Sequence, residues 1–190
     1  MNNFIFLLLA LILVSCSSLS EKTISRMDGE SKPSWATQEK ALTIADGKMY
    51  ILGFSELDAD SKISAAYRMA DSQARGELSK MVENQFSSIF QNLEEGTNDE
   101  GTLSRYYASE VSKNMLRELK ISKRYWEKVQ TIDRDGAPMF RLRVYSLAEI
   151  PESHYKKLVR EKIAQEKIDP AVKKQVLNHF ESEIKQFQAN

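Results

Sequence analysis

Cysteine is almost absent from this chain of 190 residues: Cys16 is the only one, and histidine occurs twice. A lone cysteine excludes an internal disulfide framework and a zinc site built from several thiolates. The motifs of a phosphate-binding loop, a serine hydrolase and a zinc peptidase (GxxxxGK[ST], GxSxG and HExxH) are missing too. With so little reactive chemistry in recognisable spacing, the sequence predicts a protein that is not an enzyme.

An excess of charge of either sign is also missing. Lys and Arg number 27 together, and so do Asp and Glu. A general nucleic-acid binder or a polybasic membrane patch needs a basic excess. We therefore expect no nucleic-acid partner.

The remaining candidate metal ligands do not form a pattern. His154 and His179 are isolated, and zinc sites use several ligands with local pairing. The acidic run over residues 94–102 lacks the spacing of a calcium-binding EF-hand loop. We expect structural histidines, a solvated loop, no metal and no cofactor.

One uncharged stretch stands at the start of the chain. Residues 4–14 are entirely apolar, and Ser15, Cys16 and a polar segment follow. The run is about half of the roughly 20 residues that a helix needs to cross a bilayer. A short apolar core with a small residue before the cleavage point is typical of a secretory signal peptide, which we place at residues 1–15.

The four residues Leu13, Val14, Ser15 and Cys16 resemble the lipobox of bacterial lipoproteins. The resemblance implies an S-diacylglycerol on Cys16, cleavage before this residue, and an N-acyl (palmitate-type) chain on the new terminus. A single acyl chain binds membranes only reversibly, whereas two or more anchor a protein stably. Ser17 resembles the default signal for sorting to the outer membrane. We therefore expect a lipid-anchored protein of the cell envelope, on the outer membrane and facing the periplasm, with surface exposure left open.

Three further segments follow the signal peptide. Residues 16–34 are rich in polar residues and predict a lipidated flexible tether. Residues 35–165 predict one folded domain, and residues 166–190 a C-terminal amphipathic helix that begins at Asp169-Pro170, with Asp as its cap. That helix packs on its own domain or mediates self-association.

The domain has one strong helical pattern. Apolar residues three and four positions apart predict a long helix over residues 63–93. Its small residues would let it lie close to a sheet; they are Ala65, Ala66, Ala70, Ala74 and Gly76. A shorter helix is predicted over residues 103–117, and another apolar stripe follows at Tyr155, Leu158, Val159 and Ile163.

The strand signals lie on either side of these helices. Residues 48–54 predict one strand, and residues 119–132 and 139–145 predict a hairpin around a turn at residues 133–138. We expect a bulge near Tyr125 and Trp126. The fold class is therefore α+β: a small antiparallel sheet of about three strands, packed by a long Ala-rich helix, with C-terminal amphipathic helices.

Several of these segments together resemble a known family. They are Pro33-Ser34-Trp35, the strand over residues 50–54, the helix over residues 65–78, Trp126, and the strand over residues 140–145. The chain resembles the Lpp-twenty type of outer-membrane lipoprotein, which includes the flagellar lipoprotein FlgP and is related to the N-terminal domain of FlgT. The resemblance implies a small α+β lipoprotein, and some members build rings around the flagellar motor. It implies no catalytic residue.

Two functions follow as expectations. The first is a structural or assembly component that joins a homo-oligomer or an envelope machine such as the flagellar base. The second is an envelope binding module for a small ligand, a peptidoglycan fragment or a partner strand added to the hairpin edge. Strand alternation turns one of Tyr125 and Trp126 outward, so this pair is a candidate interface; packing in the sheet is the alternative.

Overall fold

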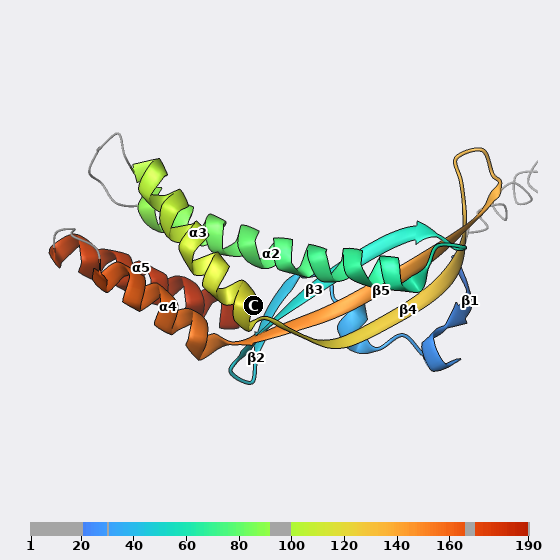
Figure 1. Cartoon of the computed structure of the whole chain (residues 1–190), viewed down its shortest axis with the longest axis horizontal. Helices are drawn as coiled ribbons and strands as arrows, with labels where there is room; N and C mark the ends of the chain where they lie inside the picture. The colour runs from blue at the N-terminus through green and yellow to red at the C-terminus, as the bar shows by residue number, and fades with distance from the viewer. Residues whose placement is uncertain (1–20, 30, 92–99, 166–169, 190) are drawn as a thin grey trace, which may run out of the picture.

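The fold is a five-stranded antiparallel sheet with the long helix of the chain along one face (Figure 1). The computed structural model describes residues 21–29, 31–91, 100–165 and 170–189. The strands are β1 (Lys22–Arg26), β2 (Leu42–Ala45), β3 (Lys48–Asp58), β4 (Lys120–Ile132) and β5 (Pro138–Pro151), in the order β1-β4-β5-β3-β2. The predicted α+β class is confirmed, with short strands β1 and β2 added at the edges of the three strands expected.

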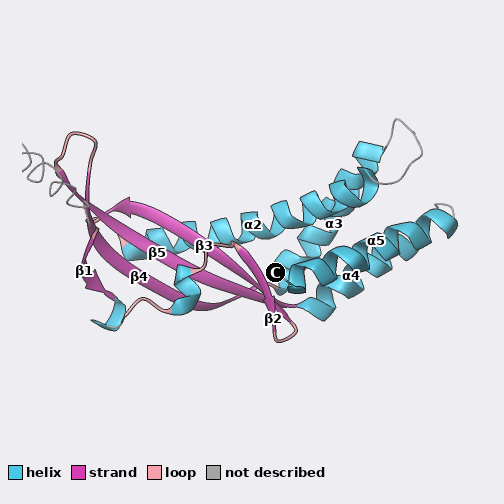
Figure 2. Ribbon diagram, turned by 180° about the vertical axis from the view of Figure 1, so that it is seen from behind, coloured by secondary structure: helices cyan, strands magenta, loops and turns pink. Residues whose placement is uncertain are grey.

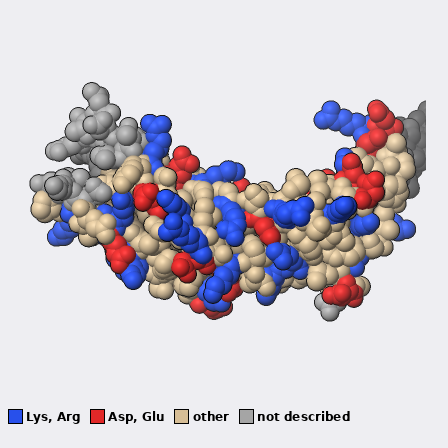
Figure 3. Space-filling view, in the orientation of Figure 1, with Lys and Arg blue, Asp and Glu red and all other residues tan. Residues whose placement is uncertain are grey.

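Four α-helices and two short 3-10 helices complete the described chain. They are α2 (Ile63–Gln91), α3 (Glu100–Glu118), α4 (Glu152–Gln165), α5 (Pro170–Ala189), η2 (Met27–Gly29) and η3 (Ser34–Thr37). Helix α2 runs along one face of the sheet and continues past its end, where α3, α4 and α5 gather (Figure 2). The molecule is therefore long and bent (Figure 3), and Figure 2 shows the sheet at one end and the helices at the other.

The close approach of α2 to the sheet depends on one glycine. A Cβ on Gly53 of β3 would lie 2.0 Å from the Ala70 carbonyl oxygen and 2.9 Å from the Ala74 Cβ. Ala66, Ala70 and Ala74 are fully buried there, as predicted. Gly76, which we expected on the same face, has no atom within 4 Å of a Cβ built on it. The contact thus pairs a strand glycine with helix alanines.

The main core lies where the helices leave the sheet. The apolar stripe of α2 is buried there through Leu78, Val82 and Phe86, together with Tyr107 and Met115 of α3. The C-terminal helices add their own stripes to the same cluster; the buried residues are Tyr155, Val159, Ile163, Val176, Phe180 and Ile184. Helix α5 begins at Pro170, as expected, and packs on its own domain.

The predicted tether is wrong for part of its length. Lys22–Arg26 forms β1, which pairs with β4, and η2 and the residues around Pro33 pack against the sheet. An edge strand needs backbone hydrogen bonds on one side and little apolar burial, so its polar composition concealed it.

The hairpin forms as predicted, but its irregularity lies elsewhere. Asp133 caps the turn, since its Oδ1 accepts hydrogen bonds from the amides of Asp135 and Ala137 at 2.9 and 2.8 Å. The register shift falls between Ile121 and Lys123, not at Tyr125 and Trp126. It lies in the part of β4 nearest the helical end, where the strand leaves α3.

Candidate functional site

The residues predicted from sequence fall into two groups. Leu13, Val14, Ser15 and Cys16 lie outside the described residues, as do residues 94–99 of the acidic loop; residues 100–102 belong to α3. The aromatic pair on β4 is described, and it is covered on both faces of the sheet.

Tyr125 is buried, whereas Trp126 keeps part of its surface accessible. Tyr125 is buried with Tyr145 and Ala36, below η3. Trp126 points to the other face and is half-buried against the cluster under the start of α2. Tyr125 therefore does not face solvent, and Trp126 does so only in part, because this region of the sheet lies between α2 and the N-terminal 3-10 helices; use of the pair as an interface stays a prediction.

The hairpin edge is covered only in part: β1 pairs with residues 127–130 of β4, and in the described chain no strand lies beside residues 120–126 on that side. β4 lies between β1 and β5, and β5 lies between β4 and β3. The sheet edges belong to β1 and β2, of five and four residues. These short strands offer little backbone of their own, but they leave residues 120–126 of β4 and 52–58 of β3 without a described strand on the outer side, so strand addition there stays a prediction.

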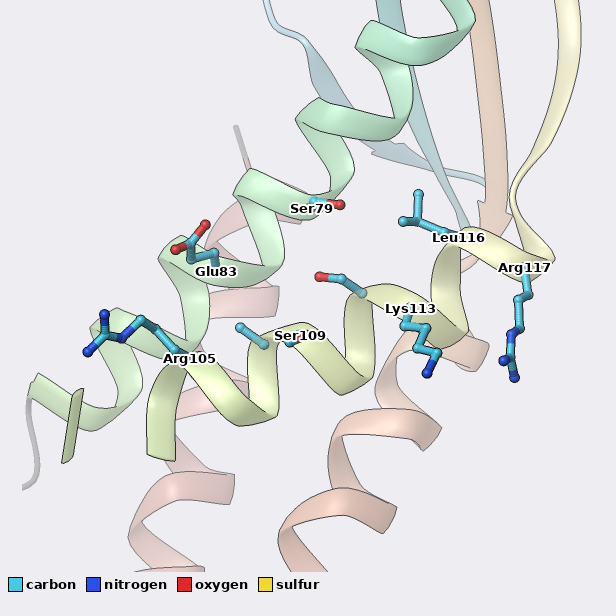
Figure 4. A pocket seen from close by; sticks show the side chains of 9 residues that line it. Ser79, Glu83, Arg105, Ser109, Lys113, Leu116 and Arg117 are labelled. Atoms are coloured by element: carbon cyan, nitrogen blue, oxygen red, sulfur yellow. The ribbon is translucent and has the colours of Figure 1, made fainter. Parts of the chain in front are cut away.

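A groove between α2 and α3 is a site that the sequence prediction missed. It has a volume of about 610 Å³; most of its lining residues are polar or charged, but most of its exposed lining surface is apolar (Figure 4). Ser79 and Glu83 enter it from α2, while α3 contributes three cations and two hydroxyls: Arg105, Ser109, Ser112, Lys113 and Arg117.

The spacing on α3 explains the groove's basic character. Arg105, Ser109, Lys113 and Arg117 recur every four residues, so they share one helix face beside the buried face. Glu83 is the single acidic residue of the lining. Arg75 of α2 lies at the same junction and donates a hydrogen bond to the Leu116 carbonyl at 3.1 Å. The groove therefore presents guanidinium, ammonium and hydroxyl donors, which suit a carboxylate or phosphate.

A second polar cluster lies on the face of the sheet that is turned away from α2. Lys32 Nζ lies 3.1 Å from Glu127 Oε1 and donates to the Tyr145 hydroxyl at 2.5 Å. The Tyr145 hydroxyl in turn donates to Glu127 at 3.2 Å. Glu127 and Tyr145 are almost inaccessible to solvent. Because each member has a partner, the network can hold the segment before η3 on the sheet without leaving a buried charge unpaired.

The pKa directions in this network agree with its geometry. Burial raises the pKa of Tyr145 above its ordinary value, and the ammonium of Lys32 only partly opposes this. Burial alone would lower the pKa of Lys32, but its hydrogen bonds to Tyr145 and Glu127 outweigh burial, so the pKa is raised. At neutral pH the lysine is charged and the tyrosine is protonated.

Alkaline solution should therefore destabilise the fold through these two groups. Each folded-state pKa is above the unfolded reference of 10.0 for Tyr145 and 10.5 for Lys32, so the unfolded chain releases its proton first as pH rises. We expect a melting temperature that is level below these values and falls above them. Tyr145→Phe should show a shallower alkaline decline; an identical decline in both proteins would contradict this assignment.

Another set of ion pairs extends along the same face. Arg143 binds Glu56 and Glu21, each at 2.6 Å. Glu21 is the first described residue, so this contact fixes the point where the N-terminal segment reaches the sheet. The two carboxylates raise the pKa of Arg143 despite its burial.

Comparison with known proteins adds no relative. No family model, curated protein or solved structure matches the chain. Within the part of the chain that the structure describes, no group of three His, Cys, Asp or Glu side chains could hold a metal ion. Among those same residues, no helix has the length and apolar character needed to cross a membrane.

Proposed function

We propose that this protein is a non-enzymatic lipoprotein of the bacterial envelope, held on the outer membrane by acylated Cys16 and facing the periplasm. Its role is structural: it joins copies of itself or an envelope assembly, with the flagellar base as the specific candidate that the family resemblance suggests. The lipobox at Leu13, Val14, Ser15 and Cys16 is the observation that carries the anchor.

The described fold is compatible with this reading. The described part of the chain begins at Glu21, five residues after Cys16, so a lipid on that cysteine would hold the domain close to the bilayer. Proteins held together on a membrane reach high effective concentrations, which favours even weak self-association.

Two measurements test the two parts of this proposal. Intact-mass spectrometry of the protein extracted from bacterial membranes should show a chain that begins at Cys16 and carries acyl mass. Crosslinking in cells, followed by identification of the captured proteins, should return copies of the chain or components of an envelope assembly. An unmodified chain that retains residues 1–15 would reject the anchor, and a strict monomer with no captured partner would reject the structural role.

The groove between α2 and α3 favours a second function, that of an envelope binding module. Three cations and two serine hydroxyls of α3 line one wall of a hollow whose exposed surface is mostly apolar, and Ser79 and Glu83 of α2 line the other. An anionic fragment of peptidoglycan, which carries carboxylates among hydroxyl and amide groups, matches this chemistry.

Charge reversal in the groove tests the second function. Purified anionic muropeptides should raise the melting temperature of the protein, and Lys113→Glu with Arg117→Glu should weaken their binding at least about tenfold, since a hydrogen bond to a charged group contributes about 1.5–3 kcal/mol. Lys174→Glu, on the exposed surface of α5, is the matched control and should bind normally. Equal binding by all three proteins, or no binding at all, would leave the groove without this role.

A further inference from the structure

The sheet end of the molecule lies within a short reach of the acylated cysteine. Glu21 follows Cys16 by five residues, which span at most about 18 Å when fully extended. Glu21 is held by Arg143 at 2.6 Å, and Lys22 pairs with Gln130 of β4. A lipid anchor at Cys16 would therefore keep this end of the sheet close to the bilayer, and the helical end could lie farther away.

Exposed apolar side chains gather at this same end. Ile24 is 50% exposed, Ile132 41% and Phe140 47%, and these are three of the six large hydrophobic residues exposed in the described chain. Ile132 pairs with Pro138, and Phe140 pairs with Gln130. Ile132 and Phe140 are thus diagonal neighbours on one face of the hairpin, within contact range of each other.

Their exposure follows from where the covering helix begins. The hairpin extends past the start of α2, so its last residues have no helix above them (Figure 1). Ile63, Tyr67 and Trp126 close the small cluster at the start of α2, and neither Ile132 nor Phe140 belongs to it. Single exposed apolar residues are common, but apolar side chains that adjoin on a surface, as Ile132 and Phe140 do, can mark a contact with another apolar phase.

We propose that this end of the sheet docks on the membrane, with Ile132 and Phe140 of the hairpin and Ile24 of β1 inserted among the lipid headgroups and upper acyl chains. The inference rests on the proposed anchor at Cys16. Because the linker from Cys16 to Glu21 is short, the surface that these apolar side chains can reach is the lipid bilayer. Aromatic and aliphatic side chains are favoured at this interfacial depth.

The charges at this end point to apolar rather than electrostatic docking. The turn carries Asp133, Arg134 and Asp135, and Lys22 lies beside it, so acidic and basic groups balance. A surface without a basic excess gains little from anionic lipid. Docking is therefore independent of anionic lipid content. It also orients the molecule, so that the helical end with the α2–α3 groove projects away from the bilayer (Figure 1).

The lone cysteine makes a sharp experiment possible. Once the thiol of Cys16 is acylated, a second cysteine is the only one free for labelling. Full-length Phe140→Cys and Ile132→Cys, each carrying an environment-sensitive fluorophore, are reconstituted in phosphatidylcholine vesicles containing lipids with a nitroxide quencher near the headgroup. Glu161→Cys on α4, an exposed position of the helical end, is the matched control.

The emission maxima of labels at positions 140 and 132 should shift to shorter wavelength, and the quencher should remove most of their emission. The label at position 161 should keep its emission. Adding phosphatidylglycerol should not change the result. Intact mass confirms acylation in each sample, so unquenched labels on acylated protein overturn the docking while the anchor stands. Energy transfer between hairpin labels on separate copies, without lipid quenching, would also overturn it and assign the patch to a second copy of the chain.

Discussion

Replacing Gly53 with alanine should unfold or severely destabilise the domain. The new Cβ would lie 2.0 Å from the carbonyl oxygen of Ala70 and 2.8 Å from the amide nitrogen of Ala74, both of them backbone atoms of α2. Over-packing a core typically costs about 1–3 kcal/mol, and backbone atoms cannot rotate away as a side chain does. We expect a loss of about 3 kcal/mol or more, a large share of the roughly 5–15 kcal/mol that stabilise a typical domain.

Urea unfolding followed by circular dichroism measures this loss, and Gly76→Ala is the matched control. Gly76 lies on the exposed surface of the same helix, and a Cβ there meets nothing within 4 Å. Alanine in a helix interior is favoured over glycine by about 0.5–1 kcal/mol, so this variant should be slightly more stable than the parent. Similar unfolding midpoints for Gly53→Ala and the parent would mean that α2 does not sit as close to β3 as described.

The contrast between the two glycines shows what the sequence could and could not predict. The periodicity of α2 was sufficient to identify its buried face, because helical spacing is a local property. The periodicity could not show which small residue allows the close approach, because that depends on the strand that the helix crosses. Both glycines were visible in the sequence, and only the register of β3 under α2 distinguishes Gly53 from Gly76.

The edge strands were missed for a related reason. β1 and β2 have five and four residues and bury few apolar side chains, so neither gives a clear alternation. β1 is held by its ladder to β4 and by ion pairs such as that between Glu21 and Arg143, which join residues far apart in the sequence. The burial of Tyr125 and the partial burial of Trp126 were missed for the same reason. Strand alternation places them on opposite faces but does not show that both faces are covered.

The α2–α3 groove was predictable only in part. The recurrence of Arg105, Ser109, Lys113 and Arg117 was present in the sequence as a polar face at helical spacing. Such a face is usually solvated surface, and only the pairing of α3 with α2 brings Ser79 and Glu83 opposite it. A partner helix converts a solvated stripe into the wall of a groove, and the sequence does not specify the angle at which the two helices meet.

The second large effect concerns Cys16. In Cys16→Ala, the thiol that we propose accepts diacylglycerol is gone, so we expect a protein that carries no acyl mass and retains residues 1–15. Its apolar run of residues 4–14 would be about 16 Å long as a helix, roughly half the thickness of the hydrocarbon core, and would be a poor membrane span. Two measurements check this. Intact-mass spectrometry reports acylation and cleavage, and washing the membranes with high salt and alkaline carbonate should release the variant but not the parent.

Ser17→Ala is the control, because it alters the next residue and keeps the thiol; it should be acylated, processed and retained like the parent. The expected difference between the two variants is large, because each buried methylene contributes about 0.8 kcal/mol to membrane binding. Two or three acyl chains therefore hold the control on the membrane, and the variant without acyl chains is not held. If Cys16→Ala is processed and retained as the parent is, the cysteine is not the anchor, and the short tether to Glu21 no longer constrains the sheet end. If it is released while its melting temperature is unchanged, the anchor acts on location alone, and the fold over residues 21–189 stands without it.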